Sequence, residues 1–111
     1  MNRSYKPTIT ERARHDPEFA QSLLDEAATL FLNGESDVAR IILRDLVNAT
    51  LGFEALARET EKPSKSLHRM LSAQGNPSMD NLAAIFGAMR AWLEVDIRVT
   101  AVPAERPHPA T

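Results

Sequence analysis

Two short amphipathic stretches on either side of a proline constrain the fold of this chain more than any other feature. In the first, Phe53, Leu56 and Ala57 fall at i, i+3 and i+4, and beyond Pro63 the same spacing is repeated by Leu67, Met70 and Leu71. Such spacing places the apolar side chains on one face of a helix. Residues 52–72 therefore predict two short helices joined by a tight turn, a helix-turn-helix unit.

The side of the second helix that faces away from this apolar set is basic. It carries Ser64, Lys65, His68 and Arg69, and no acidic residue occurs between Lys62 and Arg69. Hydroxyl groups, Lys and Arg are the donors that base edges and phosphates accept when a helix lies in the major groove. The face predicts either contact with DNA or the solvated side of an ordinary helical bundle.

Three segments of this region resemble one family of regulators. They read Leu56-Ala57-Arg58-Glu59-Thr60, then Lys65-Ser66-Leu67-His68-Arg69-Met70-Leu71-Ser72, then Gly75-Asn76-Pro77-Ser78-Met79. From roughly Val38 to Val102 the chain resembles lambda-repressor-like (XRE) helix-turn-helix regulators, and within that lineage the HigA-like addiction-module antidote proteins.

The resemblance implies a mainly α fold, a five-helix domain with one C-terminal β-strand. It also implies a transcriptional repressor that needs no cofactor and binds a double-stranded DNA operator as a homodimer. The protein is then either an antitoxin that neutralises a RelE-like toxin or a stand-alone regulator. Base contacts are expected from Ser64, Lys65, His68 and Arg69. Phosphate contacts are expected from Arg58, Lys62, Asn76 and Ser78.

Some of these residues have a second interpretation that does not involve DNA. His68 is otherwise a polar position one turn from Lys65, and Arg58 is spaced to pair with Glu54 at i, i+4. Asn76 and Ser78 equally suit a turn and a helix cap.

The turn departs from the family pattern. Where the family has Gly and then an apolar residue, this chain has Glu61 and Lys62, and Pro63 replaces the usual capping Ser. A non-Gly residue in the left-handed conformation costs of order 1 kcal/mol. Either Glu61 accepts that strain or the turn has another shape. The second helix begins either with Ser64 as its cap or with Pro63 as its first residue.

Three more helices flank this unit. Asp16 before Pro17 predicts a helix that the acid caps and that runs to Leu32. A helix from Ser36, capped by the Ser36 hydroxyl, to about Leu51 has a wide apolar face. The width predicts either a helix packed on both sides or a groove for a partner, and packing is favoured. The solvent side of this helix is expected to carry Arg40, Arg44 and Asp45. After Gly75, a last helix capped by Ser78 has a core stripe of Leu82, Ile85, Phe86 and Met89.

From Ala91 the apolar period changes to two. The alternation predicts a β-strand over residues 91–102, with a buried face made by Leu93, Val95, Ile97 and Val99. A single strand leaves its backbone donors and acceptors unpaired, which invites a second strand. That strand comes from a homodimer partner, from a toxin, or from Tyr5 to Thr10 of the same chain, and homodimer pairing is favoured.

These elements divide the chain into three parts. Residues 1–15 predict an N-terminal arm and residues 16–102 a single helix-turn-helix domain. The proline-rich residues 103–111 predict a disordered tail.

Composition narrows the classes of function. With 13 basic and 15 acidic residues the net charge is −2, so DNA binding must depend on a local basic face, on dimerisation and on salt. There is no cysteine, no His pair with metal spacing and no Gly-rich phosphate loop, so an enzyme is not expected. No apolar run approaches a membrane span or a signal peptide, which predicts a cytoplasmic protein without a membrane partner. The acidic balance and the altered turn favour the alternative, a protein-interaction module without DNA binding.

Overall fold

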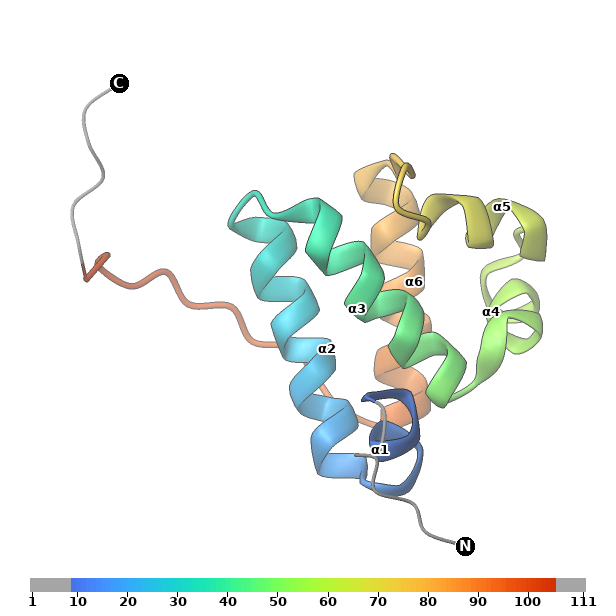
Figure 1. Ribbon diagram of the computed structural model, residues 1–111, viewed down its shortest axis with the longest axis horizontal. Helices are drawn as coiled ribbons and strands as arrows, with labels where there is room; N and C mark the ends of the chain where they lie inside the picture. The colour runs from blue at the N-terminus through green and yellow to red at the C-terminus, as the bar shows by residue number, and fades with distance from the viewer. Residues whose placement is uncertain (1–8, 106–111) are drawn as a thin grey trace, which may run out of the picture.

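The computed structural model of the 111-residue chain describes residues 9–105. These residues form six helices and are mainly helical, with bounds α1 Ile9–His15, α2 Pro17–Leu32, α3 Ser36–Ala49, α4 Gly52–Thr60, α5 Ser64–Met70 and α6 Met79–Leu93. Helices α2 and α3 lie side by side and antiparallel, and α4 and α5 lie on the side of α3 away from α2 (Figure 1).

The apolar stripes predicted from sequence meet in one hydrophobic core. Leu24 of α2 and Leu43 of α3 are buried there. The other large side chains that are fully buried come from α3 and from the chain after it: Leu46, Val47, Leu56, Leu67, Leu71, Ile85 and Met89. Helix α3 buries a wide face, because α1 and α2 pack on one side of it and α4 on another. The expectation that this helix is packed on both sides is therefore confirmed.

Two of the predicted helix caps are present and one is not. The Asp16 carboxylate accepts the backbone N–H groups of Glu18 and Phe19, both at 3.1 Å, and so caps α2. The Ser78 hydroxyl accepts the N–H of Asn81 at 3.1 Å and caps α6. The expected cap by Ser36 is wrong, since Ser36 is the first helical residue of α3 and the residue before it makes no side-chain cap bond.

The predicted N-terminal arm contains a helix. Residues 9–15 form α1, which packs on α2 and α3 and buries Ala13. The Arg12 guanidinium lies 4.3 Å from the centre of the Phe19 ring, a cation–π contact that links α1 to α2. The mixed charge of this stretch concealed the helix, because its stability comes from packing on α2 and α3 rather than from an apolar stripe of its own. The remainder of the expected arm, residues 1–8, lies outside the described residues.

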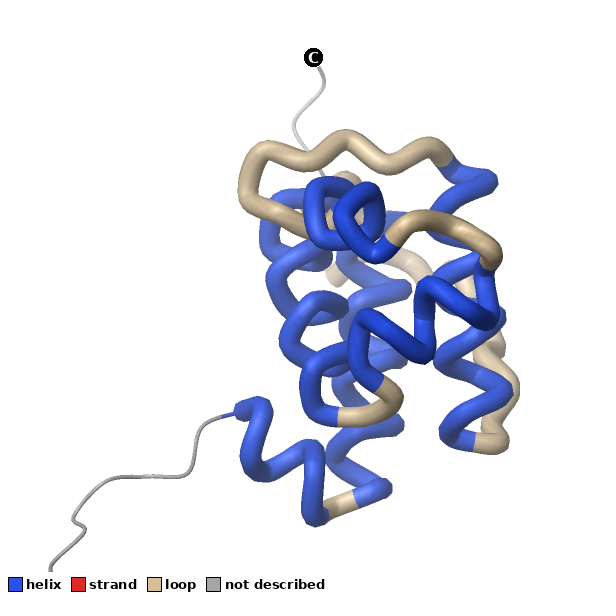
Figure 2. The backbone as a smooth tube through the Cα atoms, turned by 90° about the vertical axis from the view of Figure 1, so that its right-hand side faces the viewer, coloured by secondary structure: helices blue, strands red, loops and turns tan. Residues whose placement is uncertain are grey.

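The predicted C-terminal strand is also wrong for the part of the chain that the structure describes. Helix α6 continues to Leu93, four residues after the buried Met89, so Leu93 extends the helical core stripe while Ala91 and Trp92 are exposed. Residues 95–104 are extended, but no segment between residues 9 and 105 pairs with them as a strand (Figure 2). The intramolecular pairing with Tyr5 to Thr10 is contradicted at Ile9 and Thr10, which belong to α1, and its other residues lie outside the described range.

The extended segment after α6 lies against α2. Val95 and Ile97 are half-buried and pack on the hydrophobic core, whereas Val99 and Val102 are 65% and 74% exposed. Open pockets of about 370 and 410 Å³ are lined jointly by the segment and by the first and second halves of α2. Residues 103–105 have no regular structure, and the rest of the expected disordered tail, residues 106–111, lies outside the described range.

Candidate nucleic-acid interface

Helices α4 and α5 are joined by a turn that depends on one left-handed residue. Glu61 has φ 56° and ψ 40°, and the N–H of Lys62 reaches the carbonyl oxygen of Ala57 at 3.2 Å. Of the two expectations for this turn, the one in which Glu61 accepts the left-handed strain is therefore confirmed. Pro63 is extended at the capping position and Ser64 is the first helical residue without a side-chain cap, so neither expected start of the second helix is correct.

The pair of helices projects from the end of the molecule opposite to the extended segment. In Figure 1 the extended segment after α6 passes α2 and leaves the molecule on one side, and α5 lies on the other side. Turning the molecule by 90° brings α4 and α5 to the front (Figure 2). Leu56 of α4 and Leu67 of α5 are fully buried, as is Leu71 just after α5. This packing leaves the opposite side of α5 open to a ligand.

The residues expected to contact bases lie on α5 and are mostly exposed. Lys65, His68 and Arg69 are exposed and Ser64 is half-buried. Lys65 and Arg69 make no ion pair within residues 9–105. Because neither cation has a carboxylate partner among the described residues, both are available to phosphates or base acceptors.

The His68 ring packs against α4. Its centre lies 3.8 Å from the centre of the Phe53 ring, with 20° between the two planes. The stack covers one face of the imidazole and ties the middle of α5 to the first turn of α4. His68 therefore has a structural contact whether or not it also binds DNA.

The residues expected to contact phosphate come from three separate places. Arg58 of α4 and Asn76 of the connection to α6 are exposed, and Lys62 of the turn is half-buried. Within the described residues no ion pair joins Arg58 to Glu54, so that alternative for Arg58 is not supported. Ser78 is exposed and caps α6, as its second interpretation expected.

Arg40 of α3 holds the chain just after α5. It is 8% exposed, its Nε donates to the carbonyl oxygen of Ser72 at 3.0 Å, and its Nη2 donates to that of Ala73 at 2.8 Å. Its Nη1 reaches the Ser36 hydroxyl at 3.4 Å. Carbonyl oxygens just beyond a helix are partial negative charges, which the guanidinium satisfies in place of a carboxylate.

The expected place of Arg40 on the solvent side of its helix is therefore wrong. The sequence did contain a signal, because Arg40 lies three and seven residues before Leu43 and Val47, both of which are buried. That spacing puts all three on one helix face.

Gly75 allows a close approach of the chain to the end of α5. A Cβ at this position would lie 2.2 Å from the carbonyl oxygen of Met70 and 2.6 Å from that of Arg69. Only glycine fits there, so the connection from α5 to α6 can fold back on the helix. Helix α5 itself stops at Met70, five residues before Gly75.

A metal cluster and a membrane-spanning helix are two further features that the described residues allow to be checked. No group of three or more His, Cys, Asp or Glu residues in residues 9–105 could hold a metal ion. None of the described helices has both the length and the apolar character needed to cross a membrane.

Comparison with known proteins identifies no relative. No family model, no curated protein and no solved structure matches the chain. The function must therefore be inferred from the residues of α4, α5 and their surroundings.

Proposed function

We propose that the protein is a sequence-specific DNA-binding regulator that inserts α5 into the major groove of an operator. The observation that carries the proposal is the exposed, unpaired pair of cations Lys65 and Arg69 on a helix whose other face is anchored by buried Leu67. No acidic residue occurs from Lys62 to Met79. Such a face attracts phosphates and offers donors to the acceptors of guanine.

In this proposal Lys65 and Arg69 contact bases, with Ser64 and His68 beside them. Arg58, Lys62, Asn76 and Ser78 contact phosphates on either side. Because the whole chain has a net charge of −2, each copy binds weakly and the affinity depends on dimerisation and on salt. A dimer places two recognition helices on successive half-sites of the operator.

The resemblance to HigA-like antidote proteins suggests a repressor of its own operon that neutralises a RelE-like toxin. A stand-alone regulator is the alternative within the same class. A neighbouring reading frame that encodes a small basic toxin-like protein favours the antidote role, and its absence favours the stand-alone regulator.

The test is fluorescence anisotropy with a labelled duplex from upstream of the gene, a scrambled duplex and a series of salt concentrations. Lys65→Ala and Arg69→Ala should each lose about 1–3 kcal/mol of binding free energy on the specific duplex and relax its base preference. Lys62→Ala should weaken binding to all duplexes alike and lower the salt slope by about one.

Arg14→Ala is the matched control, because Arg14 is an exposed cation on α1. It should leave binding to both duplexes unchanged. Equal losses from Lys65→Ala and Arg69→Ala on both duplexes would leave these residues with phosphate contacts only. Absence of binding at low salt by the folded protein would refute the proposal.

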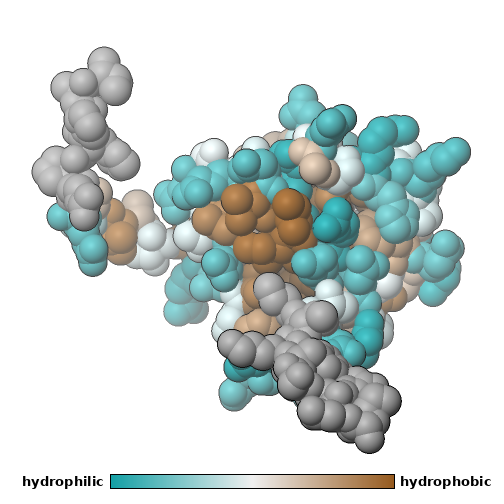
Figure 3. Space-filling model, viewed as in Figure 1, coloured by the Kyte–Doolittle hydropathy of each residue, from teal (hydrophilic) through white to brown (hydrophobic). Residues whose placement is uncertain are grey.

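One observation favours a protein-interaction module as the second candidate. Apolar side chains gather on the surface over α2 and α3 (Figure 3). The exposed large apolar side chains of these two helices are Leu32, Val38 and Ile41, which are 57%, 45% and 40% exposed. Contiguous exposed apolar residues are typical of protein contact surfaces. If the DNA experiment fails, this surface is where a partner should be sought.

A further inference from the structure

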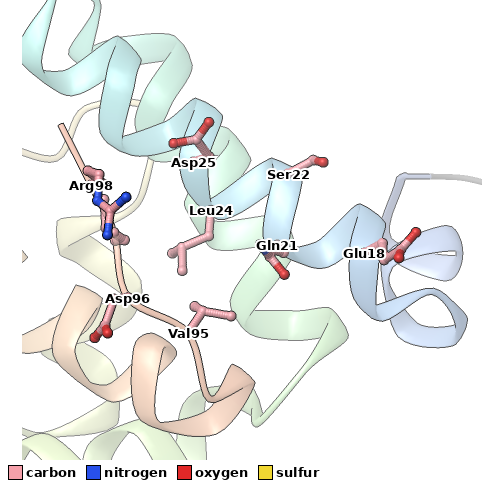
Figure 4. Close-up of a pocket in the computed structure, with 9 residues that line it drawn as sticks. Glu18, Gln21, Ser22, Leu24, Asp25, Val95, Asp96 and Arg98 are labelled. Atoms are coloured by element: carbon pink, nitrogen blue, oxygen red, sulfur yellow. The ribbon is translucent and has the colours of Figure 1, made fainter. Parts of the chain in front are cut away.

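The extended segment 95–102 has an alternating pattern of side chains and a backbone that no described residue pairs with as a strand. No backbone hydrogen bond joins residues 96–105 to any other described residue. The segment is held to α2 by side chains, and Figure 4 shows Val95 facing Leu24 while Asp96 points away from α2. An unpaired extended backbone of this kind pairs readily with another strand.

We infer that the segment pairs, antiparallel and about a two-fold axis at Ile97, with the same segment of a second copy of this chain. The inference deepens the proposed function, since it names the surface through which the regulator would dimerise. An isologous contact of this kind uses one patch twice and closes at two copies.

Charge fixes the register. With Ile97 on the axis, Asp96 lies opposite Arg98 of the second copy, and the same pair occurs again on the other side of the axis. An axis at residue 96 or at residue 98 would instead set two like charges opposite each other. An axis between two residues would set apolar side chains opposite polar ones. Among these alternatives only the axis at Ile97 avoids both conflicts.

Burial agrees with the same register. Val99 is 65% exposed in the single chain, and the axis at Ile97 places it opposite Val95 of the second copy, on the face that packs on the core. In Figure 1 the segment leaves the molecule on the side of α2 away from α5. A second copy bound there leaves α4 and α5 uncovered, so dimerisation and DNA binding use separate surfaces.

Two experiments without DNA test the inference. The first uses the absence of cysteine from the native chain. Ile97→Cys should form an intermolecular disulfide under mild oxidation, because directly opposed antiparallel residues lie within disulfide reach. Position 96 of one copy lies opposite position 98 of the second copy. Asp96→Cys alone and Arg98→Cys alone should therefore not cross-link, whereas a mixture of the two variants should.

The second experiment exchanges the charges and measures the dimer dissociation constant by sedimentation equilibrium. Asp96→Arg sets like charges opposite each other twice and should weaken the dimer about tenfold or more. The double variant with Asp96→Arg and Arg98→Asp should regain native affinity. It cannot restore the ion pair between Arg90 and Asp96, so recovery must come from the contact between copies.

Several outcomes would overturn the inference. They are a chain that is monomeric at every concentration, a dimer unaffected by the charge changes, or the absence of a disulfide at position 97. A monomer that takes a strand from a different protein is one form of the first outcome. A monomer that binds the operator would support the proposed DNA-binding function and refute the pairing of the segment. A dimer that pairs through the segment but binds no DNA would support the pairing and refute the proposed function.

Discussion

Helices α4 and α6 end in the same way but lead into different kinds of chain. Each is followed by a glutamate in the left-handed conformation, Glu61 with φ 56° and Glu94 with φ 58°. In each case the next residue donates its N–H to the carbonyl oxygen five residues earlier, at 3.2 Å after Glu61 and 3.1 Å after Glu94. The two helix ends are thus equivalent in their backbone.

The segments beyond the two glutamates differ in how they are held. After Glu61 the chain forms α5, whose Leu67 is fully buried and whose far end is held by Arg40. After Glu94 the chain is extended and is anchored by half-buried Val95 and Ile97. No backbone hydrogen bond links residues 96–105 to the rest of the described chain. The left-handed residue at the end of a helix therefore sets only the direction of the chain. Buried side chains and paired backbone groups decide how firmly the next segment is held.

Removing one apolar anchor from each region should give the largest difference. Leu67→Ala should lower the free energy of unfolding by about 2–5 kcal/mol, because it leaves a cavity at a fully buried position. Ile97→Ala removes a half-buried side chain and should cost about 1 kcal/mol. Urea unfolding followed by circular dichroism measures both, at a protein concentration low enough to keep the chain monomeric. Equal losses would mean that the two regions are held alike.

Arg40 should give the next largest effect. Arg40→Met keeps much of the side-chain volume but leaves the carbonyl groups of Ser72 and Ala73 without their donor, so about 1–3 kcal/mol of stability should be lost. Arg40→Lys should lose less, since one ammonium can still reach one carbonyl. Arg44→Met is the control, because its side chain is 39% exposed and its pair with Asp45 spans 3.8 Å. A loss from Arg44→Met as large as that from Arg40→Met would argue against the role of the Arg40 hydrogen bonds.

Much of the helical framework could be predicted from sequence. The start of α2 followed from Asp16 and Pro17, and the start of α6 from Ser78, because capping is a local interaction between neighbouring residues. The two helices around Glu61 followed from apolar spacing alone. The same spacing predicted that Lys65 and Arg69 are exposed, because they lie on the side of the helix opposite to its buried apolar residues.

The errors concern positions where a distant contact decides the local structure. Arg40 is buried because the carbonyl groups of Ser72 and Ala73 lie within its reach, more than 30 residues along the chain. Helix α1 forms because α2 and α3 cover it, although its own sequence has no clear apolar stripe. The strand was expected because alternation at 93–101 is correct as a pattern, but a strand also needs a partner, and sequence alternation does not supply one.

The smallest expected effect tests whether the two helix ends are equivalent. Glu61→Gly and Glu94→Gly each remove a Cβ from a left-handed residue, which relieves about 1 kcal/mol, and each also makes the unfolded chain more flexible, which offsets part of the gain. Each variant should therefore be more stable by less than about 1 kcal/mol, and the two gains should agree because the two φ angles do. Glu61→Ala and Glu94→Ala are the controls, since alanine removes the charge but keeps the strain. A gain from alanine equal to that from glycine would assign the effect to charge. A gain in stability at Glu61 without one at Glu94 would mean that the chain after Glu94 relieves the left-handed strain by moving. The two helix ends would then differ, as the chain segments beyond them do.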